Sequence, residues 1–265
     1  MNKLISSSVY KKDFKKVASI ASELGCGVEI SRFKMFLTDE EKQKAISETK
    51  KSFENFDGEL TLHGHFFDLN VASRDPEIER VSIMRFEQAL DIAVDMGMKT
   101  VLFHSGYNAF KHRDYQKQFR EWSLDFWKDF IKKFEKAGVV AVIENVLEET
   151  PEKNLAIIET INSPNLKLSL DIGHANVYSK VPVIEWIKAY KKYLYHMHIH
   201  NNFGDDDSHF SVLNGTINFR KVVETLIEEN LSPKIVFEIF KENELRESVN
   251  FFNKLCKEIV SPVSM

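Results

Sequence analysis

Short apolar runs recur along the 265-residue chain, and amphipathic helical patterns separate them. Four to eight consecutive Val, Ile, Leu or Phe residues are typical of strands buried on both faces, as in a parallel sheet. The runs predict eight strands, at Lys3–Ser8, Gly27–Ser31, Glu59–Gly64, Lys99–His104, Val139–Glu144, Lys167–Asp171, Leu194–His200 and Lys234–Ile239.

The helical patterns between these strands carry start and stop signals. Asp75 and Thr150 each precede a proline, which predicts a helix N-terminus, and Gly25, Gly97 and Gly138 predict helix ends. The expected helices are Lys11–Leu24, Asp39–Phe53, Pro76–Met96, Tyr115–Lys136, Pro151–Ile161, Val183–Lys191, Phe219–Glu229 and Glu242–Ile259. Eight strands alternating with eight helices predict an α/β protein, a single (β/α)8 barrel domain over residues 1–265.

Nine acidic and histidine residues lie at the ends of the strands or just beyond them. In a (β/α)8 barrel the C-terminal strand ends meet on one face, where active sites are built. Imidazole and carboxylate groups together are ligands for Zn, Mn, Fe or Co, and burying so many ionisable groups without a cation would be costly. The nine residues are His63, His104, Glu144, Asp171, His174, His198, Asp207, His209 and Glu238.

Composition narrows the class of protein. The formal net charge is −4, and without a basic tail this does not favour non-specific nucleic-acid binding. Cys26 and Cys256 show no metal-site spacing and suggest a reducing compartment. The chain shows no signal peptide and no apolar segment of membrane-spanning length, so we expect a cytoplasmic protein. Assembly into a homo-oligomer is left open.

Five stretches carry a family resemblance: LHGHFFDLN, TVLFHSGYN, VIENV, LSLDIGHANVYS and HMHIHNNFGDDDSHF. Over nearly the whole chain, the sequence resembles the xylose-isomerase-like TIM-barrel superfamily, which includes sugar (phosphate) isomerases and epimerases and endonuclease IV. The resemblance implies that the central metal ligands are Glu144, Asp171, His198 and Glu238. It also implies that the additional ligands, which let endonuclease IV hold three zinc ions, are His63, His104, His174, Asp207 and His209.

The sequence departs from the family pattern at two places. His65 stands where proline is common, and Val212-Leu213-Asn214-Gly215 replaces an LGEG segment. These departures concern substrate contacts rather than the metal ligands.

The resemblance implies a metal-dependent sugar or sugar-phosphate isomerase or epimerase with a carbohydrate substrate. A divalent ion (Zn, Mn or Co, one to three per chain) would polarise the carbonyl, and an enediolate would form when the adjacent proton is removed. Glu144 and Glu238 are the expected catalytic bases on opposite sides of the substrate. The expected substrate contacts are His65, Phe67, Asn108 and His174.

The alternative is an endonuclease IV-like multi-zinc phosphodiesterase acting on abasic DNA. The complete set of nine residues favours it. Against it stands the acidic run Asp205-Asp206-Asp207, which would repel a DNA backbone. Lys111, His112 and Arg113 form only a small basic patch. We therefore expect a carbohydrate rather than a nucleic-acid partner.

Further side chains are expected near the same face. His196, His198 and His200 alternate along one strand, so they face the same side. The resemblance selects His198 as the ligand, and we expect His196 and His200 to pack in the barrel or to hydrogen-bond to ligands. Glu29 is expected to reach the pocket or to form an ion pair. The loops expected to overhang the site are Arg32–Thr38, Phe66–Asp75, Ser105–Asp114 and Asn201–Asn218.

Overall fold

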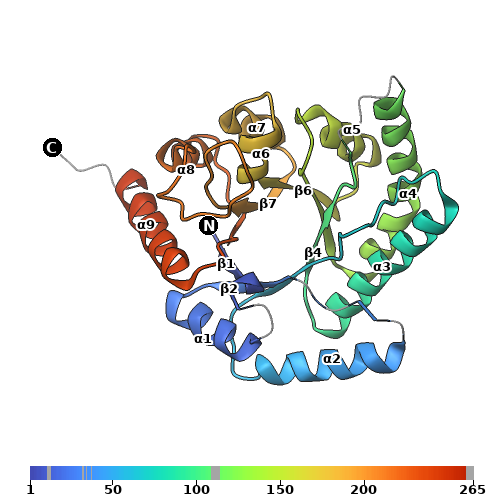
Figure 1. The fold of residues 1–265 in the computed structure, drawn as a ribbon, viewed down its shortest axis with the longest axis horizontal. Helices are drawn as coiled ribbons and strands as arrows, with labels where there is room; N and C mark the ends of the chain where they lie inside the picture. The colour runs from blue at the N-terminus through green and yellow to red at the C-terminus, as the bar shows by residue number, and fades with distance from the viewer. Residues whose placement is uncertain (11–12, 32, 34, 37, 109–113, 261–265) are drawn as a thin grey trace.

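The computed structural model describes residues 1–10, 13–31, 33, 35–36, 38–108 and 114–260. Within them, eight parallel strands pair in chain order, and β1 pairs with β8 to close a barrel. Helices surround the strands on the outside (Figure 1). The predicted (β/α)8 TIM barrel is therefore confirmed. Its strands are β1 Lys3–Ser6, β2 Gly27–Ile30, β3 Leu60–His63, β4 Thr100–His104, β5 Val140–Glu144, β6 Leu166–Asp171, β7 Leu194–Ile199 and β8 Lys234–Phe237.

The described residues contain one more α-helix than the sequence predicts. The additional helix is α6, and the Asp171 side chain caps it by accepting a 2.7 Å hydrogen bond from the His174 backbone N–H. Its seven residues are too few for a helical period to appear in the sequence. The helices are η1 Ser7–Val9, α1 Phe14–Leu24, α2 Asp39–Ser52, α3 Pro76–Asp95, α4 Tyr115–Ala137, α5 Glu152–Ile161, α6 Ile172–Tyr178, α7 Val183–Tyr190, α8 Phe219–Glu228 and α9 Glu242–Val260.

Most predicted helix boundaries are confirmed. Asp75 caps α3 by accepting from the N–H of Glu77 at 2.9 Å, and Pro76 follows as the first helical residue. Gly25 and Gly138 end α1 and α4 in the left-handed conformation, with φ of 62° and 63°, which glycine adopts without strain. The prediction that Thr150 caps α5 was wrong. Pro151 is the N-cap residue, because its own carbonyl accepts the first helical hydrogen bond, from Leu155 at 3.2 Å.

Alternation along the strands separates the core from the site. Met197 and Ile199 of β7 are fully buried in the apolar layer that the helices cover. On β4, Phe103 stacks on Phe86 of α3 with ring centroids 4.2 Å apart. Because successive side chains point to opposite faces of a strand, the neighbouring His104 and His198 face the barrel interior. The apolar layer thus fixes the strands that present the polar residues.

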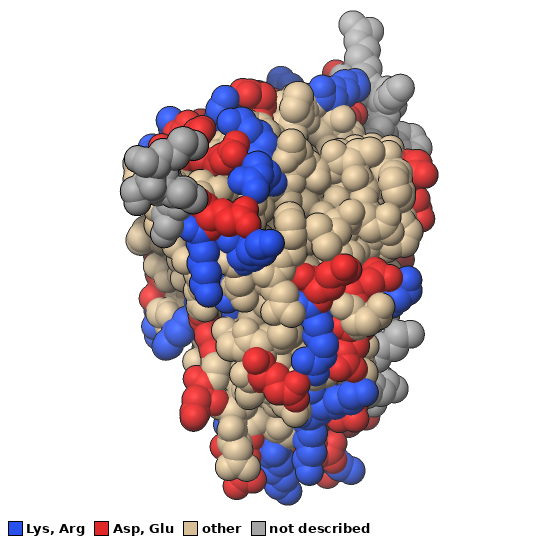
Figure 2. Space-filling view, turned by 90° about the vertical axis from the view of Figure 1, so that its left-hand side faces the viewer, with Lys and Arg blue, Asp and Glu red and all other residues tan. Residues whose placement is uncertain are grey.

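The outer surface carries both basic and acidic side chains. On the side of the molecule that carries α9 (left in Figure 1), Lys and Arg side chains are interspersed with Asp and Glu (Figure 2). In the described part of the chain, no helix is both long and apolar enough to cross a bilayer. The predicted basic patch of Lys111, His112 and Arg113 lies outside the described residues.

Candidate metal centre

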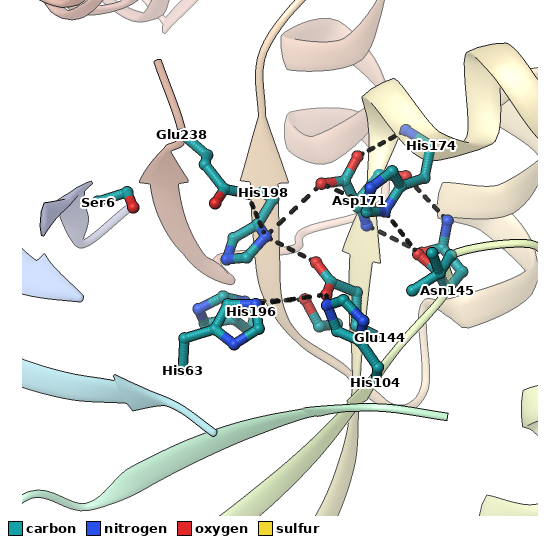
Figure 3. A network of polar contacts seen from close by, with 12 residues as sticks. Ser6, His63, His104, Glu144, Asn145, Asp171, His174, His196, His198 and Glu238 are labelled. Carbon is teal, nitrogen blue, oxygen red and sulfur yellow. Dashed lines mark hydrogen bonds and ion pairs between the residues drawn. The ribbon is translucent and has the colours of Figure 1, made fainter. Parts of the chain in front are cut away.

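Three carboxylates converge on one imidazole nitrogen at the C-terminal end of the barrel. The Nδ1 atom of His198 lies 2.6 Å from Glu144 Oε1 and 3.2 Å from Glu238 Oε2. Asp171 Oδ2 lies 3.5 Å from the same nitrogen. Figure 3 shows the three carboxylates pointing toward His198 from β5, β6 and the end of β8. The strand register produces this arrangement, since Asp171 is paired with His198 across β6 and β7.

Glu144 also contacts a second group of ligands. Its other oxygen, Oε2, lies 3.1 Å from His104 Nε2 and 3.9 Å from His63 Nε2. These histidines are the last residues of β4 and β3, and His104 is paired in register with Glu144. The two oxygens of this fully buried carboxylate therefore face two different sets of imidazoles.

A third group forms around Asp207 in the loop after β7. The Oδ2 atom of Asp207 lies 3.1 Å from His209 Nε2 and 3.3 Å from His174 Nε2. The position of His174 follows from α6, whose N-terminus is capped by Asp171. His200 Nε2 lies 3.2 Å from Asp171 Oδ1 and 3.6 Å from Asp207 Oδ1. All nine residues expected from the sequence thus meet in one connected site.

The electrostatics hold the carboxylates ionised. Burial alone would raise the pKa of Glu238, but the neighbouring charges of His198, His209 and His63 outweigh it and lower this pKa to about 2. The pKa values of Glu144 and Asp171 are likewise well below their usual range, despite burial, because of nearby histidines. The acids raise the pKa of His198 well above its ordinary value against the effect of burial. The ionised carboxylates therefore give the site a negative potential that favours a cation.

Several side chains of the site are arranged to bind a divalent cation rather than to hydrogen-bond to one another. Glu144 Oε1 and Oε2, His198 Nδ1 and Asp207 Oδ1 are buried and have no hydrogen-bond partner among the described residues. They nevertheless lie at the short distances given above from neighbouring ligand atoms, without hydrogen-bond angles. Buried polar atoms without partners are costly, and cations bound between them would satisfy them. Candidate ligand atoms of Glu144, Asp171 and His198 lie within 4.8 Å of one another, as do those of His63, His104 and Glu144.

A cavity of about 460 Å³ opens above the site. Phe67 lines it and is 61% exposed, and His174 lines it as well. His65 and Asn108 do not appear among the described residues that line this cavity. His65 instead donates from Nε2 to the carbonyl of Phe33 at 2.8 Å, which links the loops after β3 and β2. Substrate contact by these four residues stays a prediction.

Two further residues near the ligands have structural roles. The Asn145 side chain exchanges two 2.9 Å hydrogen bonds with the backbone of Asp171 and so joins the ends of β5 and β6. Gly173 leaves room for His200, because a Cβ atom there would lie 1.9 Å from the imidazole Cε1. The sequence carried no signal for the role of Gly173, because α6, the helix that contains it, was itself not predicted.

Comparisons with known proteins show a matching family and similar relatives. The model of the family described as xylose isomerase-like TIM barrel matches residues 19–255. The uncharacterized protein MJ1311 of Methanocaldococcus jannaschii is 29% identical over 182 residues, which are 66% of this chain and 62% of that relative. The aligned part of the chain therefore spans less than two thirds of the relative's length.

Solved structures share the whole architecture. A D-tagatose 3-epimerase-like protein has a TM-score of 0.86 at 24% identity, and the match covers 100% of both chains. The TTHB071 protein from Thermus thermophilus, in crystals soaked with ZnCl2, has a TM-score of 0.82 at 20% identity. That match covers 97% of this chain and 99% of the other. At these identities the similarity shows the fold.

Proposed function

Since the chain belongs to the xylose isomerase-like TIM-barrel family, we propose that it is a metal-dependent sugar or sugar-phosphate isomerase or epimerase. One domain over residues 1–265 would carry this activity. The observation that carries the proposal is the pair Glu144 and Glu238, which approach His198 Nδ1 from β5 and from the end of β8. Two ionised carboxylates from different strands suit proton removal on one side of a carbon and proton return on the other.

The central ligands would be Glu144, Asp171, His198 and Glu238. When bound there, a divalent cation such as Zn, Mn or Co supplies polarisation of a substrate carbonyl, which acidifies the neighbouring C–H. Both glutamates line the cavity, and Glu238 is the more accessible base, since 13% of its side chain is exposed and Glu144 is fully buried. His104 and His198 contact the two oxygens of Glu144.

The cavity supports a small carbohydrate substrate. Histidines and acids line it together with Phe66, Phe67, Tyr178 and Phe240. A lining of aromatic and polar groups suits a sugar, whose C–H face is apolar and whose hydroxyls need hydrogen-bond partners. The fold shared with a D-tagatose 3-epimerase-like protein supports the same substrate class.

A phosphodiesterase with several metals is the second candidate. The favouring observation is that Glu144 directs one oxygen to His198 and the other to His63 and His104, as a carboxylate between two cations would. The group around Asp207 adds a third set of ligands. The net charge of −4 is unfavourable for gripping DNA.

The decisive experiment compares Glu144→Gln and Glu238→Gln with the wild type. Glutamine keeps the size of the side chain but cannot take a proton, so each variant should lose turnover and keep its fold. Exchange of solvent deuterium into a panel of ketoses and ketose phosphates measures the reaction. Glu48→Gln, at an exposed position on α2, is the matched control and should keep full activity.

Near-native deuterium exchange in both site variants on a confirmed substrate would contradict the two-glutamate mechanism. Metal-dependent incision of an abasic-site duplex at catalytic rates, lost in Glu144→Gln, would contradict the isomerase assignment. Elemental analysis adds an independent measure, because one metal per chain supports the isomerase and three support the phosphodiesterase.

Cys26 and Cys256 are free thiols, which supports action in the reducing cytoplasm.

A further inference from the structure

We infer that Glu29 is a positioning residue that holds His198 with Nε2–H directed away from the carboxylates and the Nδ1 lone pair directed toward them. The inference rests on the proposed function only in requiring a cation at the central ligands. Glu29 is on β2, across the barrel from β7, and the sequence assigned it no definite role.

Glu29 is 1% exposed and contacts the Nε2 side of His198, whereas the three carboxylates contact Nδ1. Its Oε1 atom accepts a 2.7 Å hydrogen bond from His198 Nε2, and its Oε2 atom accepts a 2.9 Å bond from His196 Nε2. A third, longer bond of 3.4 Å comes from the hydroxyl of Thr61. A carboxylate accepts and does not donate, so each of these partners must be the donor.

The donor requirement determines which nitrogen of His198 is left to bind a cation. Because Nε2 carries the hydrogen that Glu29 accepts, Nδ1 can present its lone pair to the three-carboxylate side. Metal-binding histidines are commonly held in this way, by a carboxylate on the nitrogen opposite the metal. The same logic continues to His196, whose Nδ1 accepts from the hydroxyl of Ser169 at 2.8 Å.

Hydrogen-bond geometry shows that Glu29 differs in its role from the residues expected to bind the cation. Glu29, His196 and His198 also have ligand atoms within 4.8 Å of one another, as a metal site would. Their contacts, however, have the geometry of hydrogen bonds, and both Glu29 oxygens are satisfied. Glu144 and His198 Nδ1 have no such partners among the described residues. The unsatisfied atoms therefore lie on the Nδ1 side of His198, and Glu29 acts through the ring.

The test is Glu29→Gln, assayed by Co²⁺ titration of chelator-treated protein. A glutamine amide has one accepting and one donating end, so it cannot accept from both histidines. We expect the Kd for Co²⁺ to rise about 10- to 100-fold, as for other residues that hold metal ligands. The visible spectrum of bound Co²⁺ should change too, since the ring orientation alters.

Ser169→Ala is the matched control. Ser169 is equally buried and belongs to the same network, but it contacts His196 rather than His198. This variant should lose some thermal stability and keep wild-type Co²⁺ affinity. Equal weakening in Ser169→Ala and Glu29→Gln would show a general structural effect and overturn the inference.

A measurement on the wild type covers the case in which Glu29→Gln fails to fold. In Zn²⁺-loaded protein with ¹⁵N-labelled histidine, the His198 resonance should show a protonated Nε2 and a metal-bound Nδ1. The opposite assignment overturns the inference. Wild-type Co²⁺ affinity in a folded Glu29→Gln variant refutes the role of Glu29 alone, whereas a wild type that binds no Co²⁺ refutes the metal-dependent function as well.

Discussion

Removing His209 should change how the stability of the metal-free protein depends on pH. The ring is satisfied on both nitrogens only when it is protonated: Nδ1 donates to the carbonyl of Glu238 at 2.9 Å, and Nε2 faces Asp207 Oδ2 at 3.1 Å. Burial would lower the pKa of His209, but Asp207 and Glu238 outweigh it and raise this pKa from 6.5 to about 9.

The sign and size of this pH effect on the free energy of unfolding follow from the linkage between protonation and folding. A pKa raised by folding stabilises the folded state fully below pH 6.5, and this stabilisation is lost as the pH rises through about 9. At 1.36 kcal/mol per pKa unit, the shift corresponds to about 3 kcal/mol. Because His174 shares Asp207 at 3.3 Å, it takes over part of the interaction when His209 is removed. We therefore expect a difference of about 2–3 kcal/mol.

The assay is thermal unfolding, in the presence of a chelator, of the wild type and His209→Gln from about pH 6 to about pH 10. Relative to the variant, the Tm of the wild type should fall by about 5–10 °C across this range, since 1 kcal/mol corresponds to about 2–4 °C at this size. Asp207→Asn should reduce the pH dependence as well. Asp206→Asn makes the same charge change one residue away and should not. Parallel pH profiles for the wild type and His209→Gln would refute the reasoning.

Three further predictions concern the site. Exhaustive chelation should abolish activity and lower the Tm, because a cation neutralises the clustered carboxylates; activity that survives verified metal loss would contradict a metal site. His104→Ala should keep one cation per chain and mainly raise KM, and loss of a cation with loss of phosphodiester cleavage would instead favour the second candidate function. Gly173→Ala should displace the His200 ring, destabilise the protein by about 1–3 kcal/mol and weaken cation binding, as calorimetry and Co²⁺ titration can measure; an unchanged Tm and Kd would show that the ring adapts without cost.

The barrel itself was predictable from the chain. Eight apolar runs separated by helical patterns allow few arrangements, because each strand must be covered on both faces and each connection must be right-handed. The same reasoning brought His63, His104 and Glu144 together, since the C-terminal ends of adjacent parallel strands necessarily meet. Helix α6 was not predicted, because it is too short to show a periodic pattern in the sequence and begins at a capping contact of Asp171 that only the structure shows.

Ring orientation could not be predicted in the same way. Along β7, alternation shows that His196 and His198 share a face, but not what each ring nitrogen contacts. A register shift between Leu168 and Ser169 aligns Ser169 with His196 and Asp171 with His198. Such a shift depends on how two strands far apart in the chain pair, and no local pattern encodes it.

The sequence by itself determined the strand order, the face of the barrel on which the polar residues meet and the residue types able to bind a cation. Only the tertiary structure decided that Glu29 holds His198 from across the barrel and that the two oxygens of Glu144 face different histidines. The physical reason is range: apolar periodicity acts between residues near in the chain, whereas a hydrogen bond between residues 169 positions apart depends on barrel closure and side-chain packing.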